Sequence, residues 1–421
     1  MEPGPQTEIS RRRLSLLYQL TQTFNASLDL DEVLNIVIDE IIKAIKAERG
    51  FVMLRSNDGE LVFQTARGMK STTIDDPELE ISRSVVDEVA ANGESLLTSD
   101  AQSDKVLSQK TSVMELKLRS VMCVPLKIKD EILGVVYVDN RLTAGIFTSD
   151  DLEFLNSIAS SAAIAIENAR LYRVAVEKGR MERDLQVARK VQSSLIPQVT
   201  PVVEGWNFGA TWLPAHEVAG DFYDFIKCKG GHIGLLIADV VDKGMAAALF
   251  MAFSRTTLRS TLGRIDSPKN GIVEANRLIS DDAAYSMFLT LAYAQIDPKT
   301  HEITYVNAGH NPPLVYRTST DSFDELTRTG MLMGVFDDAI YEQETIEMNQ
   351  GDFIMLYTDG ITEAINKNNE EFGMDRLKDI LLKHHNDSAE IIKDKTIETL
   401  EKFVGNAPQF DDTTLLVAKR A

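Results

Sequence analysis

The chain has 421 residues, of which 44% are hydrophobic and 26% are charged. This length favours two or three domains with separate cores, and the composition is typical of soluble globular domains rather than of disordered or fibrous chains. Acidic residues number 64 and basic residues 44, so the net charge is -20, which excludes nucleic acid as an expected partner.

Segments that direct a chain into or across a membrane are not found in the sequence. The first ten residues, MEPGPQTEIS, contain no apolar signal core, and apolar residues nowhere run for the roughly eighteen positions that a membrane span needs. Cys123 and Cys228 lie in apolar or mixed segments, which argues against a disulfide framework or a cysteine metal site. We expect a cytoplasmic protein with no membrane partner, whose residues 1–10 form a flexible tail.

The first part of the chain begins with helices and continues into a sheet. Apolar residues at helical spacing predict two amphipathic helices over residues 11–47, separated at Leu28 and Asp29. The apolar runs Gly50 to Leu54 and Glu60 to Thr65 flank the turn Asn57-Asp58-Gly59, which predicts a β-hairpin.

The pattern continues with a helix, two strands and a longer helix. We expect a helix from Ser82 to Asn92 and strands at Ser120 to Ile128 and Glu131 to Asp139. The sequence Phe147-Thr148-Ser149-Asp150 then begins a long helix with a threonine or serine N-cap and acidic residues in its first turn. Residues 11–172 therefore describe one α/β domain.

Two segments of this domain, RSVMCVPLKIKDEILGVVYVDNR and FTSDDLEFLNSIASSAAIAIENARLY, resemble the GAF family. The resemblance covers most of the first 172 residues and implies a sensor of a small molecule or of redox state, or a dimerisation module. The fold does not determine the ligand, so the GAF ligand stays unknown and a domain that only dimerises is an alternative.

Residues 173–197 are expected to form a coiled-coil linker helix. Apolar residues fit an a/d heptad register over about five heptads, with Lys178 and Gln192 as polar intrusions, until Pro197 ends the pattern. A helix packed on its own domain would give a similar stripe, but a new domain begins after Pro197, which favours a homodimer through this helix. The apolar positions are Ile164, Leu171, Val174, Met181, Leu185, Ala188 and Leu195.

Residues 198–421 place acidic residues at the ends of strands that look buried. Asp221 lies in EVAGDFYD, Asp239 closes HIGLLIAD, Asp359 closes DFIMLYTDG and Asp411 opens FDDTTLLVA. Each alone is more often a turn former or helix cap. Together, converging carboxylates repel one another unless a cation neutralises them, so the cluster implies a metal. Ligation by oxygen alone, without histidine or cysteine at ligand spacing, favours Mg²⁺ or Mn²⁺ over Zn²⁺.

Five ordered motifs in this region resemble the PPM-type protein phosphatases, and in particular the bacterial branch of stage II sporulation protein E and the RsbU-type sigma-factor regulators. The motifs are EVAGDFYD, ADVVDKGMAAALFMA, VNAGHNPPLVY, LYTDGITEA and DDTTLLV, with ARKVQSSLIP before them. The resemblance spans about residues 188–420 and implies an α-β-β-α sandwich. The expected fold class is thus α/β (α+β) with two domains: a GAF-like sheet with helices, a helical coiled-coil linker and a PPM-type domain.

Matched motif by motif, the resemblance implies that Asp221, Asp239, Asp359 and Asp411 bind two Mn²⁺ or Mg²⁺ ions. The backbone carbonyl of Val240 would take a position usually held by a glycine. The implied mechanism uses both ions to activate a water that attacks phosphorus in line, so that no phosphoenzyme nucleophile is needed.

Some residues near these motifs have less certain roles. Many members of the family carry Ser-Gly-His where this chain has Val241-Asp242-Lys243, and Lys243 or a water could replace the histidine as an acid for the leaving group. His310 lies in a Gly- and Pro-rich connection and is expected to brace a turn. Asp224, Asp242 and Asp412 are expected to assist the ligands from a second shell or to hold metal-bound water.

The resemblance predicts a GAF-regulated protein serine/threonine phosphatase that acts on a phosphorylated regulatory protein, such as a STAS-domain anti-sigma-factor antagonist. No arginine stands at a motif position suited to clamp the phosphate, so recognition is expected to use the partner's surface as well. One alternative is a non-catalytic interaction protein with a degenerate phosphatase domain. Another is a cyclic-nucleotide-regulated enzyme that acts on a small phosphoester.

Overall fold

The computed structural model describes residues 5–56, 58–68, 72–74, 81–98, 120–141, 146–282 and 287–421. The chain divides into two compact units, residues 1–180 and 181–421, and each is described by itself. Among the described residues, no helix has the length and apolar character needed to cross a bilayer.

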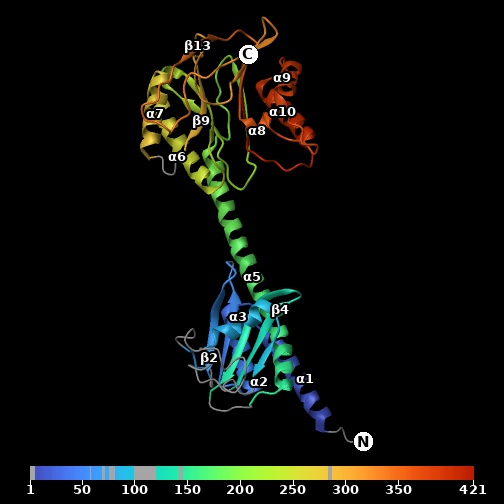
Figure 1. The fold of residues 1–421 in the computed structure, drawn as a ribbon. Helices are drawn as coiled ribbons and strands as arrows, with labels where there is room; N and C mark the ends of the chain where they lie inside the picture. The colour runs from blue at the N-terminus through green and yellow to red at the C-terminus, as the bar shows by residue number, and fades with distance from the viewer. Residues whose placement is uncertain are drawn as a thin grey trace. The chain divides into compact units, whose positions relative to one another are not determined.

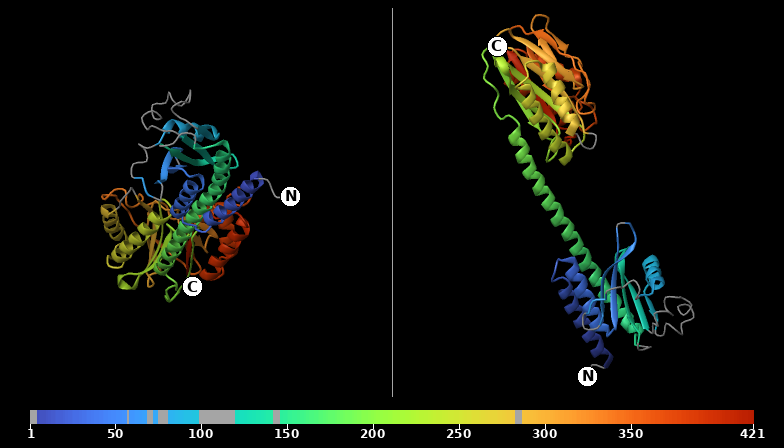
Figure 2. Two further views of the ribbon diagram at one scale, coloured as in Figure 1. Left: turned by 90° about the horizontal axis from the view of Figure 1, so that it is seen from below. Right: turned by 90° about the vertical axis from the view of Figure 1, so that its left-hand side faces the viewer.

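The first unit is one antiparallel sheet with helices on both faces (Figure 2). Its five strands have the order β2-β1-β5-β4-β3. The strands are β1 (Arg49–Arg55), β2 (Leu61–Gly68), β3 (Leu96–Thr98), β4 (Ser120–Ile128) and β5 (Glu131–Asn140), and the helices are α1 (Pro5–Phe24), α2 (Leu30–Ile45), α3 (Arg83–Asn92) and the first part of α5 (Ser149–Leu195).

Successive side chains of β4 and β5 point to opposite faces of the sheet, so the core of this unit has two layers. Met122 and Val124 pack in the cluster that contains α1, α2 and α5, whereas Val121 and Cys123 pack in the cluster that contains α3. The predicted hairpin, helices and strand pair are all present, although Asn57 of the predicted turn lies outside the described residues. The helix α1 begins at Pro5, inside the segment expected to be a flexible tail.

The helix α5 is a single element of 47 residues. Thr148 and Asp151 form a reciprocal cap at its start, because the Asp151 amide donates to Thr148 Oγ1 at 3.2 Å and the Thr148 amide donates to Asp151 Oδ2 at 3.1 Å. The helix ends at Leu195, two residues before Pro197. No break separates the domain helix from the predicted linker 173–197, and the division between the two units falls within α5.

The second unit has two packed antiparallel sheets with helices on both outer faces (Figure 1). The first sheet has the order β13-β10-β9-β8-β7 and is covered by α6 and α7. Its elements are β7 (Phe222–Lys227), β8 (Ile233–Val240), α6 (Met245–Leu262), α7 (Pro268–Asp282), β9 (Leu289–Ile296), β10 (Glu302–Ala308) and β13 (Glu344–Glu347).

The second sheet has the order β12-β11-β14-β15-β6 and is covered by α9 and α10. Its elements are β6 (Trp206–Leu213), β11 (Leu314–Arg317), β12 (Ser322–Glu325), β14 (Phe353–Tyr357), α8 (Asp359–Thr362), α9 (Gly373–Lys383), α10 (Ala389–Val404) and β15 (Thr413–Arg420). Along β15, Leu416 packs in the core shared with the first sheet, whereas Leu415 and Val417 pack against the helices. These four layers confirm the predicted α-β-β-α sandwich.

Candidate active site

Two of the predicted aspartates lie side by side at one end of the first sheet. Asp221 immediately precedes β7, and Asp239 is the penultimate residue of β8. The two strands are antiparallel with Phe222 opposite Ala238, which places Asp221 beside Asp239. Asp221 is 2% exposed, and its carboxyl is near enough to Asp239 for the two charges to repel each other.

The other two aspartates lie where β14 and β15 meet in the second sheet. Asp359 begins α8 just after β14, and Asp411 and Asp412 come directly before β15. Tyr357 lies opposite Leu415 in this antiparallel pair, so the end of β14 and the start of β15 are neighbours. The strand ends of both sheets therefore bring these acidic residues close together where the two sheets meet.

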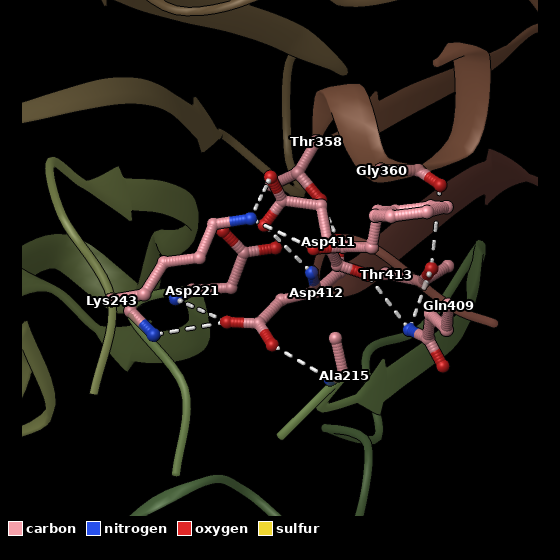
Figure 3. A network of polar contacts seen from close by, with 11 residues as sticks. Ala215, Asp221, Lys243, Thr358, Gly360, Gln409, Asp411, Asp412 and Thr413 are labelled. Carbon is pink, nitrogen blue, oxygen red and sulfur yellow. Dashed lines mark hydrogen bonds and ion pairs between the residues drawn. The ribbon is translucent and has the colours of Figure 1, made fainter. Parts of the chain in front are cut away.

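Thr414 of β15 links the two sheets at this point through its side-chain hydroxyl. The Thr414 hydroxyl donates to Asp221 Oδ2 at 2.8 Å, and the Thr414 amide donates to Thr358 Oγ1 at 3.1 Å. The Asp412 carboxylate accepts hydrogen bonds from the amides of Ala215 at 2.8 Å and Gly220 at 2.9 Å (Figure 3). Asp412 thus holds the loop that carries Asp221, a role that its place beside Asp411 in the sequence does not reveal.

Burial and mutual repulsion raise the pKa values of the clustered carboxyls. Burial raises the pKa of Asp221 well above its usual range, and the neighbouring Asp239 and Asp412 raise it further. Burial, with Asp359 as the main charged neighbour, raises the pKa of Asp239 to about 7. The pKa of Asp359 is raised by burial and by Asp411. The cluster therefore favours either protonation or a bound cation.

Lys243 supplies a positive charge to this cluster. Its ammonium group donates to Asp411 Oδ2 at 2.9 Å and to the Phe410 carbonyl at 2.7 Å (Figure 3). A cavity of about 10 Å³ lies between Lys243, Asp239 and the Asp411 segment, which is room for about one water. Within the described parts of the chain, no three acidic, histidine or cysteine side chains already surround a point that could hold a metal ion.

The donor atoms nevertheless suit a hard divalent ion. Asp221, Asp239, Asp359 and Asp411 offer only carboxylate oxygens, as Mg²⁺ and Mn²⁺ prefer. The Val240 carbonyl faces the same loop, because a Cβ added to Gly220 would lie 3.0 Å from that oxygen. Lys243 is half exposed, so its side chain has room to leave Asp411 when an ion arrives.

Asp242 occupies a special backbone position between β8 and α6. Its φ is 77°, in the left-handed region that favours glycine, and aspartate is among the few other residues that adopt it. Asp242 also lines the small cavity beside Asp239 and Lys243.

His310 and Asp224 make contacts outside the carboxylate cluster. Both His310 ring nitrogens are used, Nδ1 with Thr290 Oγ1 at 2.7 Å and Nε2 with the Tyr357 carbonyl at 3.1 Å, and burial lowers its pKa to about 4. His310 therefore braces the sheets as a neutral side chain. Asp224 pairs with Arg255 at 2.9 Å and Arg259 at 2.5 Å on α6, which differs from the predicted role beside the metal ligands.

Family comparisons match both halves of the chain. Residues 27–167 match the GAF domain, and residues 229–421 match stage II sporulation protein E. The second match contains Asp239, Asp359 and Asp411 but begins after Asp221.

Several known proteins are similar to this chain. It is 29% identical over 269 residues to the phosphoserine phosphatase RsbU of Bacillus subtilis, which covers 64% of this chain and 79% of RsbU. The phosphoserine phosphatase RsbP of the same organism is 26% identical over 187 residues, 43% of this chain and 46% of RsbP. The SiaA-PP2C domain of Pseudomonas aeruginosa shares the fold, with a TM-score of 0.52 and 20% identity over 59% of this chain and 99% of that domain.

Because Gly360 has no side chain, the segment that begins at Asp359 can pack against the backbone of Asp412. The substitution Gly360→Ala is therefore expected to disturb the site. The added Cβ would lie 1.9 Å from the Asp412 carbonyl oxygen. We expect a loss of about 1–3 kcal/mol in the free energy of unfolding and a loss of activity of about tenfold or more. Urea denaturation and phosphatase assays check this, with Gly179→Ala as the control because the space around Gly179 is open. Wild-type stability and activity in Gly360→Ala would contradict the close approach.

The raised pKa of Asp239 predicts how the stability of the chelator-treated protein changes with pH. The carboxyl has a pKa of about 7 when folded and 3.8 as its ordinary value, so between these pH values the folded state holds a proton that the unfolded chain releases. Stability therefore falls as pH rises through this window. We expect wild type to lose more stability than Asp239→Asn between pH 5 and pH 7.5, by on the order of 1 kcal/mol or more. Parallel urea midpoints for the two proteins would contradict this.

Proposed function

We propose that this chain, whose residues 27–167 match the GAF domain and whose residues 229–421 match stage II sporulation protein E, dephosphorylates a phosphoserine or phosphothreonine of a regulatory protein in a metal-dependent reaction. The carboxylate cluster where the two sheets meet is the observation that carries this proposal. Asp221, Asp239 and Asp359 are held there with raised pKa values, as expected of a site that a cation completes.

The proposed cofactors are two Mn²⁺ or Mg²⁺ ions. Asp221, Asp239, Asp359, Asp411 and the Val240 carbonyl would hold them. Such ions supply the charge that activates a water and that neutralises the phosphoryl oxygens during an in-line displacement.

The chain's own residues have separate tasks in this reaction. Thr414 orients the Asp221 carboxylate, and Asp412 fixes the backbone that carries it. Because its ammonium group pairs with Asp411 at the rim of the cluster, Lys243 is placed to donate a hydrogen bond to a phosphoryl or leaving-group oxygen. It thereby offers an acidic group where many relatives carry a histidine.

A cavity beside the cluster favours a protein substrate over a small phosphoester. It has a volume of about 310 Å³ and extends from Gly360 and Asp411 along α10, with apolar walls that include Leu400 and Val404. An apolar side chain next to the phosphorylated residue would fit this cavity. Among regulatory proteins, a STAS-domain anti-sigma-factor antagonist is the proposed partner, in keeping with the similarity to RsbU.

We further propose that the protein acts as a homodimer joined through α5. Leu171, Val174 and Met181 are 57%, 56% and 65% exposed in the single chain, although they follow the spacing of a coiled-coil seam. A second copy of the same helix would bury this stripe and give the GAF domain a route to the phosphatase domain. By this proposal both domains function in the cytoplasm.

An assay of Mn²⁺-dependent phosphate release tests the catalytic proposal. We expect release from a phosphoserine STAS-domain protein, and a loss of more than about 100-fold in Asp239→Asn and in Asp359→Asn, since each removes a charged ligand. Asp266→Asn is the matched control, because the Asp266 side chain is 77% exposed and lies outside every motif. Metal binding without turnover on any phosphoprotein would support the interaction-protein alternative, and activity that survives both substitutions would refute the site.

Substitutions on α5 test the proposed dimer. Val174→Glu and Met181→Glu each place a charge in the expected seam, so we expect a shift from dimer to monomer in light scattering coupled to gel filtration. Val176→Glu makes the same chemical change on the opposite side of the heptad, at a valine that is 47% exposed, and is expected to leave the dimer intact. A monomeric wild-type protein, or equal effects of all three substitutions, would contradict the seam.

A further inference from the structure

A buried glutamine interrupts the apolar stripe near the end of α5. Gln192 is 4% exposed, and its side chain bonds both polar groups of one residue, Ala219. Its Nε2 donates to the Ala219 carbonyl at 2.6 Å, and the Ala219 amide donates to its Oε1 at 3.0 Å. This pairing satisfies the carboxamide and the backbone together, and it explains a polar residue in a stripe otherwise suited to apolar contacts.

Ala219 belongs to the loop that delivers Asp221 to the carboxylate cluster. The next amides in this loop, those of Gly220 and Asp221, donate to Asp412 Oδ2 at 2.9 Å and 3.4 Å. The loop is therefore held by hydrogen bonds to Gln192 of α5 and to Asp412, which lies just before β15. The loop packs closely against β8 at Gly220, because a Cβ added at that position would lie 3.0 Å from the Val240 carbonyl oxygen.

The segment after α5 is anchored to the same region of the first sheet. The Tyr223 hydroxyl donates to the Pro197 carbonyl at 2.8 Å, and Ile196 is buried in the central core. By contrast, Arg189 reaches the His216 carbonyl only at 3.5 Å and at the surface. Gln192 is thus a buried residue of α5 whose side chain hydrogen-bonds the loop before Asp221.

We propose that Gln192 is a positioning residue that couples the end of α5 to the metal-binding carboxylate of Asp221. A rotation or shift of the helix end moves the Ala219 peptide directly, and Asp221 follows two residues later. The inference rests on the proposed metal-dependent function, because it assigns Asp221 to metal binding. It adds a specific contact through which a change in α5 alters the affinity for the ion.

The variant Gln192→Met, whose side chain has a similar size and shape, tests this coupling in the 421-residue chain. It keeps the length of the side chain and removes both bonds to Ala219. Titration calorimetry with Mn²⁺ is expected to show a dissociation constant raised by about tenfold or more, as for other residues that orient metal ligands. Turnover should recover toward the wild-type kcat at saturating Mn²⁺, because the carboxylates themselves remain.

Gln198→Met is the matched control. Gln198 donates to the carbonyls of Ser193 and Ile196, both at 3.0 Å. Within the described residues it forms no hydrogen bond with the loop before β7, so wild-type Mn²⁺ affinity is expected. If Gln192→Met fails to fold, Gln192→Asn keeps an uncharged carboxamide on a side chain one methylene shorter, which weakens the bonds to Ala219 without burying a charge, and an intermediate loss of affinity is expected.

Hydrogen exchange of the chelator-treated protein separates this inference from the proposed function. Exchange at the amides of residues 219–221 is expected to accelerate in Gln192→Met and not in Gln198→Met. Unchanged exchange and unchanged Mn²⁺ affinity in Gln192→Met would overturn the coupling. A wild-type protein that binds no Mn²⁺ would refute the metal-dependent function, and accelerated exchange in the same experiment would still support the contact between Gln192 and the loop.

Discussion

Mutual repulsion among clustered carboxylates is the constraint around which the second unit is organised. Asp221 is buried and Asp239 and Asp359 are partly buried, so solvent screens their charges only in part and the pKa values of all three carboxyls are raised. The fold tolerates the cluster because protons, the Lys243 ammonium and backbone amides offset part of the charge. The remaining negative charge of the carboxylates needs a bound cation, and the proposed chemistry of the site depends on that cation.

The sandwich architecture explains why residues so distant in sequence meet. Antiparallel strands return to the same edge, so the start of β7 lies beside the end of β8, and the end of β14 lies beside the start of β15. Thr414 then bonds across the interface between the sheets. Helices on both outer faces leave the strand connections at this end for the carboxylates, and rigid strands hold each side chain in place.

The sequence was sufficient to predict the fold of both units, since period-two and helical patterns, turn residues and ordered motifs are local signals. It also indicated four aspartates that lie near the junction of the two sheets, and their role as metal ligands stays a prediction. Roles set by long-range contacts were not predictable: Asp412 as the anchor of a loop, Thr414 as the partner of Asp221, and Gln192, which looked like an intrusion. The predicted flexible tail missed the helix that begins at Pro5, because a polar helix end carries little periodic signal.

Both native cysteines are free and buried, one in each unit, and burial raises the pKa of each thiol. A thiol that is hard to ionise and hard to reach reacts slowly with alkylating reagents. A single cysteine introduced on an exposed stretch of α5 can therefore carry a spin label or a fluorophore without removal of Cys123 or Cys228. The chain is thereby well suited to spectroscopic distance measurements that follow this helix while the rest of the protein stays native.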